Sequence, residues 1–466
     1  MITLMLDLNL MNNFCFIIFL YIRLFVYFYI NMLQVIIPMA GIGSRFRDYG
    51  FKTNKYLLPI NIDLQTMIEL AIISLNINIP AKYFFIFNAE YNNKNNLAYL
   101  LHQLCNKYDI IYEIHTVETL TDGPACTVAS IKDYLNLQEP IIISNSDQVL
   151  ENWNFEEFYK TCLKYDGCVL TYTPSYELKI NNSDKHSFIH INKHNIVDEC
   201  KEKIILSDQA LVGVHYFKTA EYFFEAYDYM IAKNMRAPNN EFYISLCYQS
   251  MIELKQKIGY HKIQENEFFW NTGEPKDYFN YLYKKGNYNN IISEDITNDI
   301  ILFSNENFSV KYLKNIKGFI KNNGLIILLN SDYTITSKDI DLKNKCNIII
   351  ITSNKYYCNV KQDYDLYNYK AGWIIGDFEP SIIKTKDFEV GILTHNKNEK
   401  WDYHYHVYLD EINILLEGNM LLNEIVINKN QLFYIPKKQI ASPIFLENCK
   451  ILCIKTPSII GDKICL

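Results

Sequence analysis

No block of like charge stands out in the chain, which is 466 residues long and carries a formal net charge of −7. A nucleic-acid groove needs a concentrated basic surface, so this absence argues against nucleic acid as a partner. The 12 cysteines include no CxxC pair and no zinc-ribbon spacing. We therefore expect them to be reduced and mostly buried, as in a cytoplasmic protein. Internal repeats are absent, and the length predicts two to three domains.

A secretory signal is also missing. Residues 14–30 are apolar but lack a basic region before them and a small-residue cleavage site after them. The stretch is short for a membrane helix and holds Arg23 near its middle. We expect residues 1–33 to be a dispensable leader outside the fold, with a membrane anchor as the alternative. The sequence leaves open whether translation starts at Met1 or Met32.

Residues 34–289 alternate short apolar runs with amphipathic stretches, which predicts an α/β domain with a mixed, mostly parallel sheet of Rossmann-like type. Helical patterns cover 66–75 and 241–255. The strand candidates are the runs at 35–39, 83–88, 140–147, 168–172 and 210–217.

Two further segments complete the predicted organisation. Residues 290–369 form a small unassigned α/β segment, with strands at 301–305, 324–330 and 347–353 around a helix at 309–322. The polar residues 286–290 are the only linker-like stretch. From 370 to 466 the pattern changes to short β runs, such as FEVGIL, EINILLEG, QLFYIP and KILCIK. That spacing predicts a small β-barrel.

A glycine-rich turn follows the first strand. GIGSRF (41–46) lacks the third glycine of a dinucleotide fingerprint, and GxxxxGK[ST] of a Walker loop is absent. Gly41 and Gly43 would let backbone amides approach a triphosphate. Arg45 and Lys55 would neutralise charge on a departing pyrophosphate. A tight turn with solvated basic residues is the alternative.

The segment resembles the signature of the sugar-phosphate nucleotidyltransferases, in the version that begins "IPMAGxGSRF". The similarity continues for about 250 residues and comprises several motifs in order. These are TDGPACTVASIKDYL (121–135), ISNSDQ (143–148), KEKIILSDQALVGVHYF (201–217), NNEFYISLCYQSMI (239–252) and FWNTGEPKDYFNYL (269–282).

The resemblance implies transfer of a nucleotide from an NTP to a sugar-1-phosphate, with release of pyrophosphate. It assigns nucleotide binding to Ala40, Gly41, Gly43 and Gly123. It assigns catalysis to Arg45, Lys55 and Asp147, and substrate binding to Glu202, Lys203 and Gly213. Asp147, placed after an apolar strand, is also a suitable Mg²⁺ ligand, with a turn or helix cap as the rival interpretation. For Glu202 and Lys203 the rival is a surface ion pair.

Two positions depart from the family pattern. Asn54 precedes Lys55 where the family has proline, which is expected to loosen the turn. Asn271 lies where many members have a second metal-binding aspartate. Either Asp147 holds the metal with help from phosphates and water, or Glu274 or Asp277 substitutes for the missing carboxylate.

The last segment contains His404, His406 and Glu411, then Gly418, with the spacing of the first cupin motif. Residues two apart on a strand share a face, so both imidazoles could point into a cupin-like barrel. With Glu411 they would form a three-ligand site for a transition metal. The second motif is degraded, because Ala441 replaces its histidine. Histidines that are only hydrogen-bonded, or that line a sugar pocket, are the alternative.

The leading hypothesis is a Mg²⁺-dependent nucleotidyltransferase fused to a cupin-like barrel, acting in glycan or surface-polysaccharide synthesis. One alternative is a non-catalytic regulatory protein that binds nucleotide sugar, which Asn54 and Asn271 favour. Another is a cupin-type sugar isomerase or epimerase. The sequence does not identify the base of the nucleotide or the sugar. A homo-oligomer is compatible with it, and membrane association is not expected.

Overall fold

The computed structural model describes residues 32–90, 96–174, 185–285, 292–320, 325–329, 335–336, 340–353 and 369–466. The apolar stretch 14–30 and the polar stretch 286–290 lie outside these ranges. The chain divides into two compact units, one extending to Tyr278 and one from Phe279 to Leu466 that also takes in residues 48–53 and 61–64. Over the ranges described, no helix is both long and apolar enough to cross a membrane.

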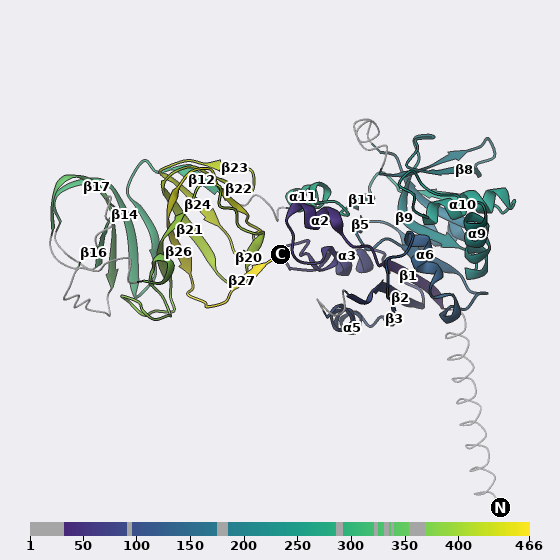
Figure 1. Cartoon of the computed structure of the whole chain (residues 1–466), viewed down its shortest axis with the longest axis horizontal. Helices are drawn as coiled ribbons and strands as arrows, with labels where there is room; N and C mark the ends of the chain where they lie inside the picture. Colours follow the sequence, from purple (N-terminus) through teal and green to yellow (C-terminus); the bar gives the residue numbers. More distant parts are fainter. Residues whose placement is uncertain are drawn as a thin grey trace, which may run out of the picture. The chain divides into compact units, whose positions relative to one another are not determined.

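The first unit is built on a nine-stranded sheet with the order β3-β2-β1-β4-β9-β6-β10-β8-β7 (Figure 1). Its strands are β1 (Leu33–Met39), β2 (Ala81–Asn88), β3 (Ile111–Val117), β4 (Ile141–Ser144), β6 (Gly167–Tyr172), β7 (Ser187–Ile191), β8 (Val197–Glu202), β9 (Ala210–Phe217) and β10 (Ile258–Lys262). A separate antiparallel pair joins β5 (Gln148–Glu151) to β11 (Phe268–Asn271).

Parallel pairing in this sheet is restricted to two groups. β3, β2, β1 and β4 run parallel, as do β6 and β10, whereas β9, β8 and β7 pair antiparallel with their neighbours. The predicted α/β class and mixed sheet are confirmed, but antiparallel pairings are as prominent as parallel ones. The reason is that β9 enters between β4 and β6 and runs against both.

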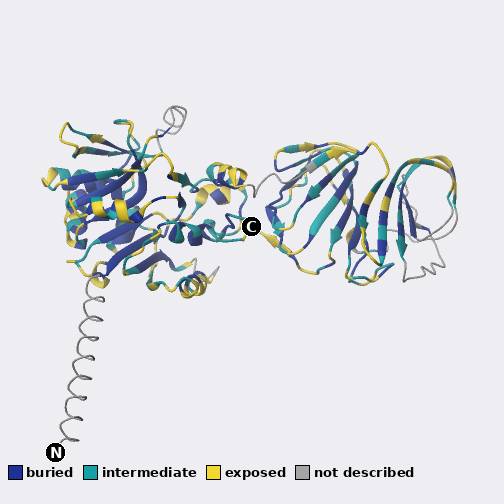
Figure 2. Ribbon diagram, turned by 180° about the vertical axis from the view of Figure 1, so that it is seen from behind, coloured by how far each residue is buried: buried dark blue, intermediate teal, exposed yellow. Residues whose placement is uncertain are grey.

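Helices cover both faces of the sheet. They are α2 (Ser44–Tyr49), α3 (Met67–Ile73), α5 (Leu97–Lys107), α6 (Pro124–Ala129), α7 (Phe155–Cys162), α9 (Ala220–Ala232), α10 (Ile244–Glu253) and α11 (Pro275–Lys284), with short 3₁₀ turns η1 (Lys55–Leu57) and η2 (Lys132–Tyr134). β1 is apolar on both faces because each face packs into its own core cluster, one through Ile36 and the other through Val35 and Ile37. Figure 2 shows these central strands buried and the helix surfaces exposed.

From Ile292 onward the second unit is β structure apart from the 3₁₀ turn η4 (Lys370–Gly372), in the residues that the structure describes. Its first strands are β12 (Ile292–Asp295), β13 (Ile300–Ser304), β14 (Phe308–Ile320), β15 (Leu325–Leu328), β16 (Ile335–Thr336) and β17 (Ile340–Ser353). The helix predicted at 309–322 is therefore wrong. This segment forms strand β14, which pairs along its length with β17 and buries Phe308, Val310 and Tyr312, residues two apart.

The barrel strands follow from residue 373. They are β18 (Trp373–Ile375), β19 (Glu389–His395), β20 (His404–His406), β21 (Asp410–Glu417), β22 (Met420–Leu422), β23 (Ile425–Ile427), β24 (Gln431–Ile435), β25 (Pro443–Phe445), β26 (Cys449–Thr456) and β27 (Lys463–Cys465). A six-stranded sheet, β12-β24-β21-β26-β19-β18, faces a three-stranded sheet and the β20–β27 pair. The predicted runs of β structure are present and form a small barrel.

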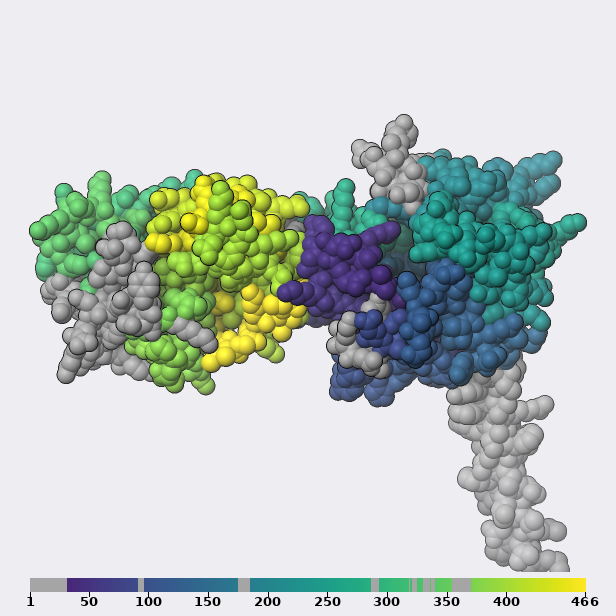
Figure 3. Space-filling model, viewed as in Figure 1, coloured from purple at the N-terminus to yellow at the C-terminus, as the bar shows by residue number. Residues whose placement is uncertain are grey.

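One apolar core joins the two halves of this second unit. It contains Tyr312 and Ile349 from the β14–β17 sheet together with Ile414 and Leu452 from the six-stranded sheet. Strand β12 also crosses over and pairs with β24. In the space-filling view the green atoms of residues 292–353 pack directly against the yellow-green atoms that follow residue 369 (Figure 3).

Candidate active site

The glycine-rich turn joins the carboxyl end of β1 to α2. Gly43 has a φ of +61°, and a side chain there would meet the Lys55 methylenes at 3.7 Å. The Gly43 carbonyl accepts hydrogen bonds from the amides of Phe46 and Arg47, at 3.1 and 3.3 Å, which begins α2. The turn therefore bends where glycine is favoured and lies against the lysine stem.

A cavity of about 280 Å³ lies beside this turn. It brings together five of the residues predicted from the sequence, namely Ala40, Gly41, Lys55, Gly123 and Asp147. Its other lining residues are Pro38, Tyr56, Leu120, Thr121, Pro124, Thr127, Asn145, Ser146, Glu241 and Tyr243. Gly43 and Arg45 are not among them.

Lys55 and Asp147 form an ion pair, with 2.6 Å between Nζ and Oδ2. Burial favours the neutral form of Lys55, but the attraction of Asp147 outweighs it and raises the pKa of the ammonium. Lys55 is thus a fixed positive charge in the cavity wall.

The amide at position 54 keeps the loop before Lys55 in place. Asn54 has φ −59°, close to the value that proline fixes, and its side chain accepts a hydrogen bond from the Tyr56 amide at 3.1 Å. The predicted loosening of the turn is therefore not seen, because the asparagine supplies a cap in place of the proline ring.

Two oxygen atoms converge beside Gly273. A Cβ at this glycine would lie 2.8 Å from Asp147 Oδ2 and 3.2 Å from Asn271 Oδ1. The β5–β11 pair causes this approach, since Gln148 is the direct partner of Asn271 and the Thr272 amide donates to the Asp147 carbonyl at 2.9 Å. A carboxylate and an amide oxygen at a side-chain-free position suit a hard cation such as Mg²⁺.

Glu274 is engaged in two ion pairs. Its Oε1 pairs with Arg45 Nη1 at 2.7 Å, and its Oε2 pairs with Lys185. Asp277 lies 4.0 Å from Lys185, and burial raises the pKa of its carboxyl group. The structure therefore uses Glu274 to hold Arg45, whose side chain is 63% exposed.

Gly123 starts α6 in a conformation that other residues avoid. Its φ is +129°, and a Cβ there would lie 2.5 Å from the Phe242 carbonyl oxygen. The Phe242 amide donates to the Asp122 carbonyl at 2.8 Å, and its carbonyl accepts from the Ala125 amide at 3.1 Å. The glycine thus allows two segments of the cavity wall to touch.

A second cavity, of about 150 Å³, adjoins the first, because Pro124, Asn145 and Tyr243 line both. It contains the predicted residues Glu202 and Gly213. Burial raises the pKa of the Glu202 carboxyl group, which accepts hydrogen bonds from the hydroxyls of Ser187 and Ser245.

Lys203 is placed differently from its neighbour. It does not line the second cavity, and its Nζ lies 5.3 Å from the centre of the Tyr243 ring, which lines both cavities. The Glu202 carboxyl group is buried against the hydroxyls of Ser187 and Ser245, and the described residues include no ion pair between it and Lys203, so the surface pair considered from the sequence is not formed.

Sequence reasoning missed the roles of Gln148 and His215. The Gln148 amide accepts from the Gly213 N–H at 3.1 Å and donates to its carbonyl at 2.9 Å, joining β5 to β9. His215 lines the second cavity, and burial lowers its pKa to about 3. The only sequence signal was their position inside motifs already noted, ISNSDQ and ALVGVHYF.

The barrel histidines lie on β20. His406 Nε2 is 3.0 Å from Glu411 Oε1, as expected for neighbours in one site. His404 instead donates Nδ1–H to the Asp402 carbonyl at 2.9 Å, and burial lowers its pKa to about 4. Throughout the described ranges, no group of three or more His, Cys, Asp or Glu side chains could hold a metal ion. The predicted transition-metal triad is therefore not formed. Glu411 pairs instead with Lys455, whose Nζ lies 3.1 Å from Glu411 Oε1.

No family model and no curated protein matches the chain. Among solved structures, it is similar to a nucleoside-diphosphate-sugar pyrophosphorylase from Vibrio cholerae, at 25% identity over 53% of this chain and 99% of that one, with a TM-score of 0.45. It is also similar to a putative glucose-1-phosphate thymidylyltransferase from Bacillus anthracis, at 16% identity over 55% and 95%, with a TM-score of 0.43. A third similar structure is the inositol-1-phosphate CTP transferase from T. maritima, at 15% identity over 55% and 96%, with a TM-score of 0.41.

Proposed function

We propose that the first unit is a nucleotidyltransferase that couples an NTP to a sugar-1-phosphate. A phosphate oxygen of the sugar phosphate attacks the α-phosphorus. The bond from that phosphorus to the β-phosphate oxygen breaks, and pyrophosphate leaves. One observation carries the proposal: the glycine turn, Lys55 and Asp147 converge on one cavity that shares a wall with a second cavity.

The first cavity would hold the nucleotide. Backbone amides at Ala40 and Gly41 face the phosphates, and the Gly123 loop faces the base. Lys55 places a permanent ammonium where negative charge grows on the departing pyrophosphate. Such a reaction depends mainly on positioning and charge neutralisation, which these groups provide without covalent chemistry. Arg45, held by Glu274 at the rim, adds a second cation.

Asp147 and Asn271 would hold Mg²⁺ in the space that Gly273 leaves open. When bound there, Mg²⁺ neutralises phosphate oxygens and polarises the phosphorus under attack. Lys55 already pairs with Asp147 through Oδ2, which orients the carboxylate before substrates arrive. One carboxylate suffices when substrate phosphates complete the coordination.

The second cavity would hold the sugar-1-phosphate. Gly213 approaches it because Gln148 fixes its backbone, while Glu202 supplies a hydrogen-bonding carboxyl for sugar hydroxyls. Lys203, above Tyr243, would neutralise the acceptor phosphate. The activated sugar would then serve glycan or surface-polysaccharide synthesis.

The test measures pyrophosphate release from a panel of NTPs and sugar-1-phosphates. Asp147→Asn should lower the turnover by about 10²–10³ or more, since removal of one such stabiliser typically costs that much. Nucleotide binding should be largely kept, because the glycine turn and Arg45 are untouched. Asp133→Asn, the same change at an exposed position in η2, should leave turnover unchanged.

Near-normal turnover of Asp147→Asn would remove Asp147 from the catalytic role. If the wild type binds nucleotide and releases no pyrophosphate with any pair, the first unit is a nucleotide-binding regulatory module. Gly273→Ala provides a further check, because its methyl group would fill the space beside Asp147 and raise the Mg²⁺ concentration needed for activity.

A further inference from the structure

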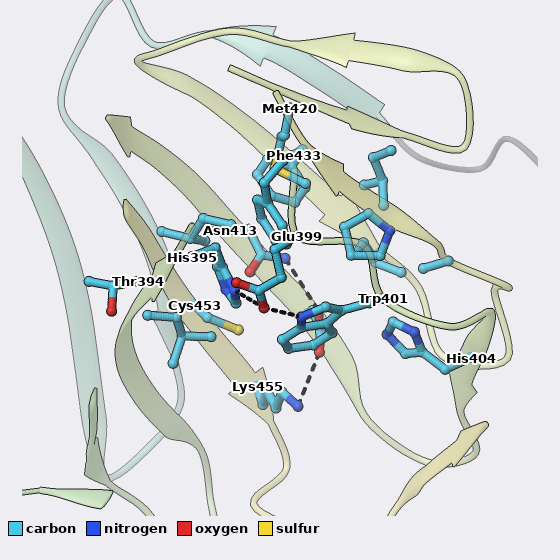
Figure 4. Close-up of a pocket in the computed structure, with 18 of the residues that line it drawn as sticks. Thr394, His395, Glu399, Trp401, His404, Asn413, Met420, Phe433, Cys453 and Lys455 are labelled. Atoms are coloured by element: carbon cyan, nitrogen blue, oxygen red, sulfur yellow. Dashed lines mark hydrogen bonds and ion pairs between the residues drawn. The ribbon is translucent and has the colours of Figure 1, made fainter. Parts of the chain in front are cut away.

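The barrel encloses a cavity of about 450 Å³, which we call the barrel cavity. Apolar and aromatic side chains form most of its wall: Trp373, Leu393, Trp401, Met420, Leu422, Phe433, Ile435, Phe445 and Ile451. A few polar groups enter between them (Figure 4). Volume and lining are those of a small-molecule site, in which apolar walls hold the body of a ligand and few polar groups orient it.

A lysine occupies the position that the sequence assigned to a metal. Glu411 and Lys455 are direct partners on the paired strands β21 and β26, so both project into the barrel cavity. Lys455 Nζ lies 3.1 Å from Glu411 Oε1 and 3.5 Å from His406 Nε2. A divalent cation bound by Glu411 and His406 would meet this ammonium at contact distance. Substrate phosphates help to hold Mg²⁺, but a transition metal in the barrel would depend on protein ligands, and the described residues include no group of three or more His, Cys, Asp or Glu that could hold one. The residues present therefore do not fit a transition metal.

A second lysine lies at the same cavity without a counter-ion. Lys463 lines the cavity, and its Nζ lies 3.8 Å from the centre of the Trp401 ring. Within the described part of the chain, Lys463 forms no ion pair with an acidic side chain. Glu411 pairs with Lys455, so Lys463 is the lysine of this cavity that a ligand can pair with, among the residues that the structure describes.

Hydrogen-bonding groups also line the barrel cavity. His404 donates Nδ1–H to the Asp402 carbonyl, which leaves Nε2 as an acceptor. Glu399 is fixed at the other side, where it accepts from His395 Nδ1 at 3.1 Å and from the Trp401 indole at 2.7 Å (Figure 4). Acceptors such as these bind hydroxyl groups.

We propose that the barrel cavity binds a small hydroxylated carboxylate of the sugar-acid class, without a metal. Its carboxylate would lie between Lys455 and Lys463, its hydroxyls would donate to His404 and Glu399, and its carbon skeleton would pack on the tryptophans. A carboxylate brings one negative charge to Lys463, whereas a phosphomonoester would bring nearly two into a cavity that already holds the carboxylates of Glu399 and Glu411. This site is distinct from the proposed nucleotidyl-transfer site and does not depend on it.

The test titrates the full-length protein with gluconate and with glucuronate, followed by fluorescence of Trp373 and Trp401. Saturable quenching by at least one of them is expected, with glucose, the neutral analogue, binding much more weakly. Lys463→Met should weaken binding by about tenfold or more, the usual loss for one charged hydrogen bond. Lys386→Met, at a position 84% exposed and outside the cavity, should bind as the wild type does.

Several results would overturn the proposal. These are no saturable binding of either acid, equal binding of glucose, or an unchanged affinity in Lys463→Met. Metal analysis provides an independent test of the proposal. A stoichiometric transition metal that the wild type retains and His406→Ala loses would show a metal site in place of the lysine site. Because Lys463 is at the surface, its variant should fold even if changes at Lys455 do not.

Discussion

Two glycines of the nucleotide cavity make different demands on the backbone. At Gly41 a Cβ would meet nothing within 4 Å, whereas at Gly123 it would meet the Phe242 carbonyl in a conformation with φ +129°. Gly123→Ala should lower the free energy of unfolding by about 1–3 kcal/mol, because such backbone strain typically costs that much. Gly41→Ala should keep stability and raise KM for the nucleotide, since its methyl enters the cavity. Urea unfolding and steady-state kinetics check both, and equal stability of the two variants would contradict the assignment.

His215 gives the first unit a predictable response to acid. Burial lowers its pKa from 6.5 to about 3, so the folded protein keeps the ring neutral while the unfolded chain takes up a proton below about pH 6.5. Stability should therefore fall as the pH drops from 6.5 toward 3, by about 2 kcal/mol at pH 5 from this residue. His215→Phe, which cannot titrate, should lose that much less between pH 7 and pH 5. Urea unfolding at the two values provides the measurement, and equal losses would contradict the prediction.

Residues that lie in one continuous motif could be placed from the sequence. The glycine turn, Lys55, Gly123 and Asp147 each follow a strand or begin a helix, and strand ends meet at one edge of the sheet. Contacts that need a pairing register could not be placed. Lys455 is the clearest case, because only the alignment of β21 with β26 sets it opposite Glu411.

Strand β14 shows that whole elements, too, can depend on pairing partners that the sequence does not reveal. Its apolar residues Val310, Leu313 and Ile316 are spaced three apart, which fits a helix, while Phe308, Val310 and Tyr312 are two apart, which fits a strand. Local periodicity does not decide between these patterns. Pairing with the long strand β17 does, and that partner begins at Ile340.

The junction between β5 and β9 offers a test at the scale of elements. Gln148 satisfies both the N–H and the carbonyl of Gly213, and all these atoms are buried. Gln148→Leu should destabilise the first unit by about 1–3 kcal/mol, because it leaves the Gly213 N–H unpaired, while the Gly213 carbonyl still accepts from the Asn145 amide at 2.8 Å. It should also raise KM for the sugar phosphate more than KM for the NTP, since Gly213 lines the second cavity but not the first. Gln138→Leu, at a surface amide, is the control, and parallel changes in both KM values would count against this role.

At the scale of the whole molecule, the chain has separate cores. Among the described residues, the core clusters of the first unit lie between Leu33 and Phe269, and those of the second lie beyond residue 290. We therefore expect two transitions in scanning calorimetry. Nucleotide with Mg²⁺ should raise only one of them, by preferential binding to the folded state, and Gly123→Ala should lower that same one. A single transition that shifts as a unit would contradict the independence of the cores.

A fragment that contains the barrel needs strand β12 to complete its sheet. This strand provides an outer strand of the six-stranded sheet, with Ile292 opposite Tyr434 and Asp295 opposite Gln431. A fragment cut at residue 370 would leave one edge of β24 unpaired, since only its other edge pairs with β21, and would uncover the apolar face that β14 and β17 bury. Open strand edges beside bare apolar surface recruit other chains, so such a fragment should precipitate or polymerise. The shortest fragment that keeps β12 paired with β24 begins before Ile292.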